Sequence, residues 1–362
     1  MIESLRNKFV KEHFDLQEIL LVPVFATVLA LLIGCFFLLA TGESFANIFV
    51  AYSSLFIGSL GSLNAISETF TAATPLVFAA LGIALAFRAG LFNIGAEGQM
   101  IVGGLATVIV GFSIDFLPIW IHLPLALSIG ALFGALYAAI AGWLKAYTGA
   151  HEVISTIMLN LIALRLLDYV LRSPIIQKEG RNDPISKSIL DSAELPQILT
   201  FVDPQLRLHG GFLLMLVAVF FIYWLLFHTT IGYEFRATGA NPNAAKYAGI
   251  KAGLTIVLVM AIAGALAGLA GANQITGVLG RASPGFSASI GFDAIAVALL
   301  GRSHPIGVLF AGLLFGALIA GGRLMQVKAG VSVDLITIIQ ALIIVFIAAP
   351  LLVKKSLPWF FK

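Results

Sequence analysis

Apolar residues gather in long runs along most of the chain, and polar residues fill the short stretches between them. A helix needs about 20 mostly apolar residues to cross a membrane. The pattern therefore predicts an all-α bundle of about ten membrane-spanning helices. The predicted spans lie near residues 20–40, 70–88, 94–114, 123–144, 151–172, 211–228, 253–275, 285–301, 304–322 and 332–353.

Two regions fit this pattern less well. The run at 285–301 is short and follows Ser283, Pro284 and Gly285, so it is the least secure of the ten. Residues 41–69 are half polar and rich in Gly and Ser. For them we expect an interfacial loop with a short helix rather than a further span.

Composition supports a membrane protein. Of 362 residues, 60% are hydrophobic and 11% are charged, and the mean hydropathy is +1.03, whereas a soluble domain carries about 25% charged residues. The net charge of +3 suits a protein whose basic residues orient its spans. Basic patches with interleaved aromatic residues are absent from the sequence, so the expected surrounding is a lipid bilayer and a nucleic-acid partner is not expected. The single cysteine, Cys35, lies inside the first apolar run, which we interpret as a retained span because no cleavage site follows it.

Basic residues predict the orientation. Short cytoplasmic loops carry an excess of Lys and Arg. If residues 1–19 are cytoplasmic, twelve of the 21 basic residues lie inside, eight lie outside, and Arg165 lies within a span. We therefore expect both termini in the cytoplasm, a long outer connection at 173–210 and a long inner connection at 229–253. The pattern Pro75, Arg88, Ile94-Gly95 is echoed by Pro284, Arg302, Ile306-Gly307 with different spacing, which leaves an internal duplication open.

The residues of the inner connection predict a short helix. Asn241 is a favourable cap, Pro242 suits the first helical position, and Gly249 can end the helix in a left-handed turn. Ala244, Ala245 and Lys246 favour helix between them. Two interpretations stay open: a surface hairpin that only connects two spans, or a docking helix for a cytoplasmic protein.

The stretch RAGLFNIGAEGQMIVGG (88–104) places Asn93, Glu97 and Gln99 among glycines at the start of a span. These polar groups are costly against lipid, so they should face the bundle interior or a water-filled path. One interpretation is that they only hold helix ends together. The other is that they line a translocation path or its gate.

Other polar residues within spans are weighed in the same way. Asp293 and Asn160 are candidates for the same path, with helix pairing as the alternative. Arg165 and Asp168, three apart on one helix face, predict a local ion pair. The histidines have no metal-binding spacing, and neither a Ser/His/Asp nor a Cys/His constellation suggests catalysis.

Three motifs in order carry a resemblance: FRAGLFNIGAEGQ (87–99), RATGANPNAAKYAGI (236–250) and GFDAIAVALLGRSHPIG (291–307). From about residue 20 to 355 the chain resembles the membrane permease subunits of ATP-binding-cassette importers, in the nucleoside and simple-sugar branch. The resemblance implies one permease domain over 1–362 that works by alternating access. Its expected partners are a second homologous permease, a cytoplasmic ATPase and an extracytoplasmic substrate-binding lipoprotein.

The resemblance also implies roles for residues. The segment from Asn241 to Gly249 would be the coupling element that fits into the ATPase. Separately from the resemblance, the long outer connection is charged, so we expect its Arg181 and Arg207 to contribute to docking of the binding protein. The sequence contains no GxxxxGK[ST] phosphate loop, so ATP and Mg²⁺ are expected on the partner ATPase rather than in this chain.

Nucleosides are the expected substrates, with a pentose or hexose as the alternative. An ion-coupled secondary transporter that uses Glu97 or Asp293, and a membrane enzyme, are the rival classes. Neither rival accounts for the inner helix.

Overall fold

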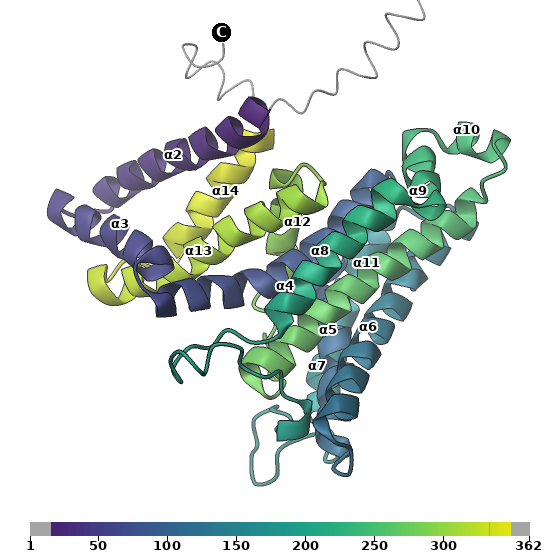
Figure 1. Cartoon of the computed structure of the whole chain (residues 1–362), viewed down its shortest axis with the longest axis horizontal. Helices are drawn as coiled ribbons and strands as arrows, with labels where there is room; N and C mark the ends of the chain where they lie inside the picture. Colours follow the sequence, from purple (N-terminus) through teal and green to yellow (C-terminus); the bar gives the residue numbers. More distant parts are fainter. Residues whose placement is uncertain (1–15, 333, 349–362) are drawn as a thin grey trace, which may run out of the picture. The chain divides into compact units, whose positions relative to one another are not determined.

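The computed structural model describes residues 16–332 and 334–348 of the chain, and helices dominate it (Figure 1). The chain folds as two compact units. Residues 56–321 form the larger one, and the smaller one combines residues of 1–55 and 322–362. The helices are α2 (Leu16–Ala40), α3 (Phe45–Leu60), α4 (Leu63–Arg88), α5 (Ala96–Ser113), α6 (Ile119–Trp143), α7 (Glu152–Leu171), α8 (Gly211–His228), α9 (Thr230–Ala240), α10 (Pro242–Tyr247), α11 (Ala252–Gln274), α12 (Ile290–Leu300), α13 (Pro305–Ala329) and α14 (Asp334–Ala348).

The predicted all-α membrane fold is confirmed. In the part that the structure describes, seven helices are long and apolar enough to cross a membrane: α4, α5, α6 with its π-helical end η1 (Leu144–Thr148), α7, α8, α11 with its π-helical end η3 (Ile275–Leu279), and α13. Shorter apolar helices stand where the first, eighth and tenth spans are predicted. The eighth, α12, is only 11 residues long. The count of about ten is therefore approximate.

Residues 41–69 contain the expected short helix, which is not among the candidate spans, but most of the expected loop is helical as well. They contain α3 and the first two turns of α4. Their hydroxyl groups return to the helix backbone: Ser53 donates to the Val50 carbonyl at 3.0 Å, and Ser59 donates to the Phe56 carbonyl at 3.1 Å. Such bonds satisfy a hydroxyl without ending the helix. Polar composition therefore did not mean loop here.

In the smaller unit, α2 packs against α14. Tyr52 of α3 donates a hydrogen bond of 2.6 Å to the Leu31 carbonyl of α2, and Asn47 donates one of 3.0 Å to the Ala329 carbonyl. These bonds join the first and last described parts of the chain within one unit. The helices α3 and α13 contribute one end to each unit.

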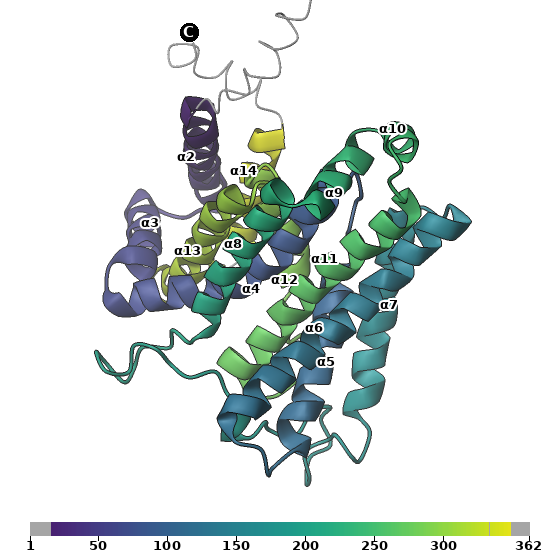
Figure 2. The same ribbon diagram turned by 45° about the vertical axis from the view of Figure 1, so that its right-hand side comes forward.

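In the larger unit, α11 packs against α4, α5 and α6 (Figure 2). Close packing depends on a glycine seam, the residues Gly103, Gly130, Gly134, Gly264 and Gly268. A Cβ added at Gly268 would collide with the Gly130 carbonyl, and one added at Gly134 would collide with the Gly264 carbonyl. Small residues let helix backbones approach closely in membranes. The seam therefore fixes α5, α6 and α11 against one another.

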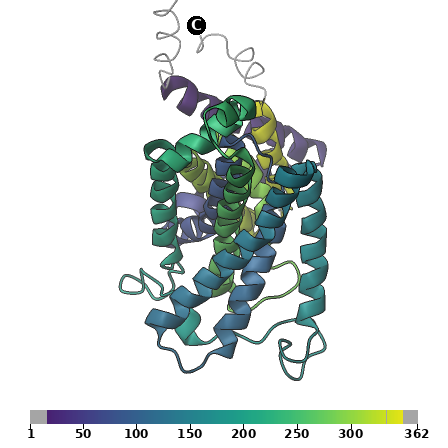
Figure 3. The same cartoon turned by 90° about the vertical axis from the view of Figure 1, so that its right-hand side faces the viewer.

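The two long connections lie at opposite ends of the larger unit (Figures 1 and 3). The segment 172–210 covers one end, and α9 and α10 stand at the other, with α8 running between them. The sequence analysis predicted a short helix in the second connection but missed α9, which Thr229 caps by accepting a hydrogen bond from the Gly232 amide. The two ends therefore offer two separate surfaces for partners.

Candidate functional site

The chain is broken between α4 and α5. After Arg88, Gly90 adopts φ +72°, and a Cβ there would lie 3.1 Å from the Gly239 Cα of α9. The backbone then stays non-helical until α5 begins at Ala96. The first amides of α5 are consequently left inside the bundle, where they need partners. We call residues 89–95 the first break.

Asn93 and Gln99 close this break from within. Their side-chain amides form a reciprocal pair: Asn93 Nδ2 donates to Gln99 Oε1 at 3.1 Å, and Gln99 Nε2 donates to Asn93 Oδ1 at 2.9 Å. Asn93 Oδ1 also accepts from the Gly95 amide at 3.0 Å. Both side chains are buried. Polar groups that would be expensive against lipid therefore satisfy each other and the backbone.

Asn160 joins the same group from α7. Its Oδ1 accepts from the Gly98 amide at 2.9 Å, and its Nδ2 donates to the Ile94 carbonyl at 2.9 Å. One side chain thus satisfies a free amide at the start of α5 and a carbonyl of the break. A Cβ at Gly98 would lie 2.9 Å from Asn160 Oδ1, so this contact requires glycine there.

Glu97 reaches to α12. One carboxylate oxygen accepts from the Ser287 hydroxyl at 2.5 Å, and the other accepts from the Gly291 amide at 2.8 Å. A carboxylate at a helix N-terminus is stabilised by the free amides and by the helix dipole. Gly291 is required because a Cβ there would collide with the Glu97 backbone. The carboxylate therefore ties the start of α5 to the start of α12.

The structure thus brings Asn93, Glu97, Gln99 and Asn160 into one buried group, which we call the Glu97 network. Asp293, the fifth predicted pathway residue, lies in the first turn of α12 and is partly exposed. Sequence reasoning missed Ser287 and Gly291. The available signal was the run of small and turn-forming residues at 282–291, directly before a short apolar helix. In the described conformation the network bonds to protein, and its role in a pathway stays a prediction.

A second cluster links α4, α8 and α9. Arg88 donates to the Ser303 carbonyl at 2.9 Å, and its guanidinium carbon lies 5.9 Å from the Phe227 ring centroid. Arg236 of α9 lies 5.3 Å from the same ring. Cations are attracted to the faces of aromatic rings. The cluster therefore connects α9 to the residue that precedes the first break.

His304 completes this cluster from the turn between α12 and α13. Its ring stacks on Phe227 with centroids 5.3 Å apart. Burial, and then the Arg88 charge, lower the pKa of His304. Phe227, Arg236 and His304 were not predicted, and their wide separation in sequence offered no signal.

The structure confirms the predicted short helix at α10. Asn241 accepts from the amides of Asn243 at 3.0 Å and Ala244 at 3.1 Å, Pro242 stands in the first turn, and Gly249 has φ +85°. Ala245 faces inward and is 3% exposed, whereas Tyr247 is 96% exposed. Any partner on α10 would therefore meet Ala244, Lys246 and Tyr247 rather than Ala245.

The 172–210 segment packs closely on the ends of α5 and η3. Ser186 donates its amide to the Ala282 carbonyl at 2.9 Å and accepts from the Ala282 amide at 2.8 Å. The Ile189 amide donates to the Gly280 carbonyl at 2.9 Å, and the Leu190 amide donates to the Gly111 carbonyl at 2.9 Å. This segment is therefore part of the fold as well as a surface.

Both predicted docking arginines lie on this surface with acidic neighbours. Arg181 donates to Asp183 at 2.8 Å, and Arg207 lies 3.5 Å from Glu68. The hydrogen bond from Arg181 lowers the pKa of the Asp183 carboxyl. Each arginine side chain remains about half exposed, at 48% and 49%, so both are accessible to a partner.

His209 is buried where this segment enters α8. Burial, and then the charge of Arg207, lower the pKa of His209 to about 4. The ring packs on η3, because a Cβ at Gly277 would lie 2.6 Å from His209 Nε2. A neutral imidazole therefore lies against the end of α11.

The sequence matches the model of the family described as branched-chain amino acid transport system / permease component over residues 65–348. A guanosine ABC transporter permease protein of Bacillus subtilis is 40% identical over 332 residues, which cover 91% of this chain and 93% of that protein. A nucleoside ABC transporter permease protein of Lactococcus lactis is 36% identical over 93% of each chain. A glucose ABC transporter permease protein of Haloferax volcanii is 36% identical over 90% of this chain and 86% of its own.

The same Bacillus and Lactococcus strains each contain another, more distant match, also described as a guanosine or nucleoside ABC transporter permease protein, at 28% and 29% identity over 69% and 70% of this chain. No solved structure matches the chain. The family model covers most of the sequence, and the strongest relatives align over nearly their full length. The chain therefore belongs to this family of ABC transporter permeases and is a multi-pass membrane protein.

Proposed function

We propose that this chain is one of two permease subunits of an ATP-driven importer that moves nucleosides into a bacterial cell. The observation that carries the proposal is the full-length similarity to permeases described as guanosine and nucleoside transporters. The second permease that matches in each of those bacteria supports a pair of homologous subunits. ATP and Mg²⁺ would bind a separate cytoplasmic ATPase, and an extracytoplasmic lipoprotein would deliver the substrate.

The exposed α10 is the proposed contact with the ATPase. Asn241, Pro242 and Gly249 give it defined ends, and Tyr247 projects from it. The neighbouring α9 holds Arg236 on Phe227, which also meets Arg88 and His304. Movement of α10 would thus reach the first break and the turn after α12 through packed side chains. Both lead to the Glu97 network, which we propose opens as the access of the pathway alternates.

This topology assigns a side to each end of the larger unit. The α10 end would be cytoplasmic, together with both termini, in agreement with the excess of basic residues in its loops. The 172–210 segment would then face the binding lipoprotein. Its half-exposed Arg181 and Arg207 would contribute contacts that weaken as salt increases.

Transport measurements test the substrate. The chain, its second permease, the ATPase and the lipoprotein are expressed together in cells that lack their own nucleoside and glucose uptake. We expect ATP-dependent accumulation of radiolabelled guanosine that unlabelled nucleosides inhibit and glucose does not. The alternative substrate is a simple sugar, favoured by the Haloferax relative. Accumulation of glucose without guanosine would establish it, and guanosine uptake that persists without the ATPase but fails with an uncoupler would indicate an ion-coupled carrier.

Substitution of Tyr247 by Ala tests the coupling contact. Because Tyr247 is 96% exposed, its removal should leave the fold intact and reduce ATPase co-purification and uptake at least fivefold. Phe116→Ala is the matched control, since Phe116 is 80% exposed at the opposite end of the larger unit. Ala245→Asp is a poorer test because it buries a charge within this chain. Equal ATPase binding by Tyr247→Ala and the unsubstituted chain would place the contact elsewhere.

A further inference from the structure

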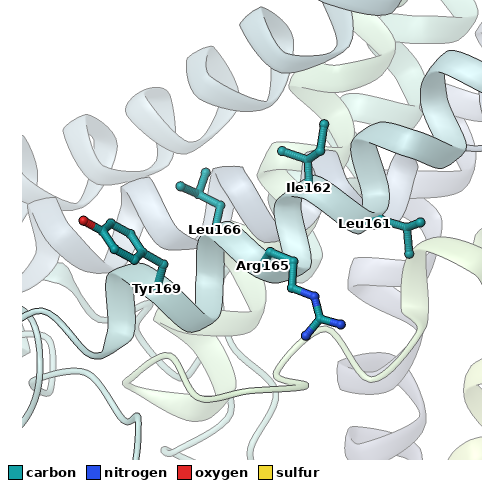
Figure 4. A pocket seen from close by; sticks show the side chains of 5 residues that line it. All are labelled: Leu161, Ile162, Arg165, Leu166 and Tyr169. Atoms are coloured by element: carbon teal, nitrogen blue, oxygen red, sulfur yellow. The ribbon is translucent and has the colours of Figure 1, made fainter.

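The outward face of α7 combines apolar and charged side chains. Figure 4 shows Arg165 projecting from this helix among Leu161, Ile162, Leu166 and Tyr169, which together line a shallow hollow of about 470 Å³. The Arg165 side chain is 88% exposed, and its guanidinium lies 4.0 Å from the carboxylate of Asp168, which is 45% exposed. The ion pair expected from the sequence is present, but it lies on the surface of a predicted membrane span.

The outward faces of α6 and α8 provide the contrast. On α8, the exposed residues include Leu213, Val217 and Phe220, and the sequence from Gly211 to Phe227 contains no charged residue. The sequence of α6 likewise contains no Asp, Glu, Lys or Arg. Such faces suit lipid, whereas a charge on a lipid-facing helix surface is costly. Arg165 is six residues from the end of α7, about 9 Å at 1.5 Å per residue, so its position is not that of a terminal charge.

A non-helical segment adjoins this face. Pro284 and Gly285, between η3 and α12, share a second hollow of about 290 Å³ with Arg165 and Asp168. Both are exposed, as are Ala288 and Ser289, which have φ values of 46° and 61°. Within a bilayer, non-helical backbone is tolerated against protein or water and not against lipid. We call residues 281–289 the second break.

Arg165, Asp168, Pro284 and Gly285 line one hollow, and Ser289 and Asp293 follow Gly285 along the chain. The α7–α12 strip, as we call it, comprises Arg165, Asp168, Pro284, Gly285, Ser289 and Asp293. Both flanking helices contact α5, and the second break leads directly into α12. The strip contains charges of both signs and is bordered by exposed Leu161, Ile162 and Phe292. Apolar residues around partly paired charges are typical of a protein interface rather than a lipid-facing surface.

We propose that the α7–α12 strip is the face on which the homologous second permease packs, so that its charges and open backbone are enclosed between two subunits. This inference rests on the proposed function, which requires such a subunit. A homologous permease is the occupant to which we commit, since the strains of the Bacillus and Lactococcus relatives each contain a second matching permease and both subunits span the same membrane. Enclosure would remove the free-energy cost of placing Arg165 against lipid, and also that of placing the backbone of the second break there.

Site-specific photo-crosslinking tests the proposal. A benzophenone amino acid replaces Ile162 beside the strip or, as the matched control, Val217 on α8; these residues are 55% and 62% exposed. The chain is expressed with its tagged second permease, ATPase and lipoprotein, and the membranes are illuminated. We expect at least tenfold more crosslink to the second permease from position 162 than from position 217. Guanosine uptake and ATPase co-purification are measured in the same cells to show that both substituted chains assemble.

Each other outcome overturns the proposal. Crosslinks from position 162 to a differently tagged copy of this chain would identify a homodimer face. Lipid adducts alone at both positions, with uptake and ATPase binding retained, would show that the strip faces lipid while the importer itself stands. If the unsubstituted chain shows neither uptake nor a co-purifying second permease, the proposed function fails and this inference fails with it.

Leu161→Trp supports the same test without a crosslinker. Leu161 and Val217 are 55% and 62% exposed, so a larger side chain at either position should leave this chain folded. We expect Leu161→Trp to reduce co-purification of the second permease at least tenfold and Val217→Trp to leave it unchanged. Equal co-purification of both variants would contradict the assigned face.

Discussion

The two breaks in the larger unit contain similar residues but are satisfied in opposite ways. The first break is closed from inside by Asn93, Gln99 and Asn160, all buried. The second exposes Pro284, Gly285, Ala288 and Ser289. Glu97 joins them, because it starts the helix after one and caps the helix after the other. The polar groups that close the first break bond within the single chain, whereas the second break bonds to Glu97 through its buried Ser287 and leaves those four residues exposed.

This difference helps to distinguish two roles, scaffolding and solute passage, that have the same sequence pattern. Polar residues and glycines within apolar runs indicate either bundle scaffolding or a path for a solute. Here the Glu97 network has the geometry of scaffolding in the described conformation, and the second break has the geometry of a surface that is covered or wet.

Glu97→Leu should cause the largest loss. It leaves the Ser287 hydroxyl and the Gly291 amide buried without acceptors, at about 1–3 kcal/mol each, or about 4 kcal/mol in total. We expect most of the permease to lose its monodisperse peak in detergent gel filtration. Asp293→Leu is the control, because Asp293 is partly exposed in the first turn of α12, two residues after Gly291. A normal peak and thermal midpoint for Glu97→Leu would show that the two breaks are not held together by this carboxylate.

Acidification should lower the free energy of unfolding through His209, which packs on η3 just before the second break. The pKa of His209 is about 4, below its ordinary 6.5, so the unfolded chain binds the proton first as the pH falls. Stability is therefore fully present above pH 6.5 and is lost as the pH decreases toward 4, by about 2 kcal/mol at pH 5. Thermal unfolding from pH 7.5 to 5 measures this loss, and His209→Gln should flatten the profile. An unchanged profile in the variant would exclude His209 as the cause.

Thiol labelling compares the two breaks directly. In a Cys35→Ala background and without the second permease, cysteine at Ser289 should react with a small hydrophilic reagent at least tenfold faster than cysteine at Gln99, which is 2% exposed. This ratio corresponds to about 1.4 kcal/mol of difference in access. In the assembled importer, trapping the ATPase should speed the labelling of cysteine at position 99 if Gln99 lines a pathway. A fast reaction at Gln99 in the resting state would show that the first break is already open to water.

Sequence reasoning succeeded where the signal was local. Long apolar runs located the spanning helices, and Asn241, Pro242 and Gly249 located α10, because capping and turn preferences act over a few residues. It failed at residues 41–69, where the Ser53 and Ser59 hydroxyl groups bond to carbonyls three positions back and the helix continues despite polar composition. Composition alone does not reveal that bond.

The site needed information from far along the chain. Glu97 meets Ser287 from 190 positions away, and Asn160 meets Gly98 from 62 positions away, so no local pattern distinguishes a paired carboxylate from an open one. The direction of Ala245 was equally hidden, because two turns of helix show no clear apolar face. Four of the five predicted pathway residues lie in the Glu97 network, but the fold sets their bonds and their pathway role stays a prediction.

The glycine seam has a mechanical consequence. Where helix backbones meet with no room for a methyl group, one helix cannot rotate or slide past another without collision. The helices α5, α6 and α11 therefore move together as one rigid body. Conformational change during transport would leave the packing of these three helices unchanged. It would instead change the backbone at the first and second breaks, which precede α5 and α12 and are not helical.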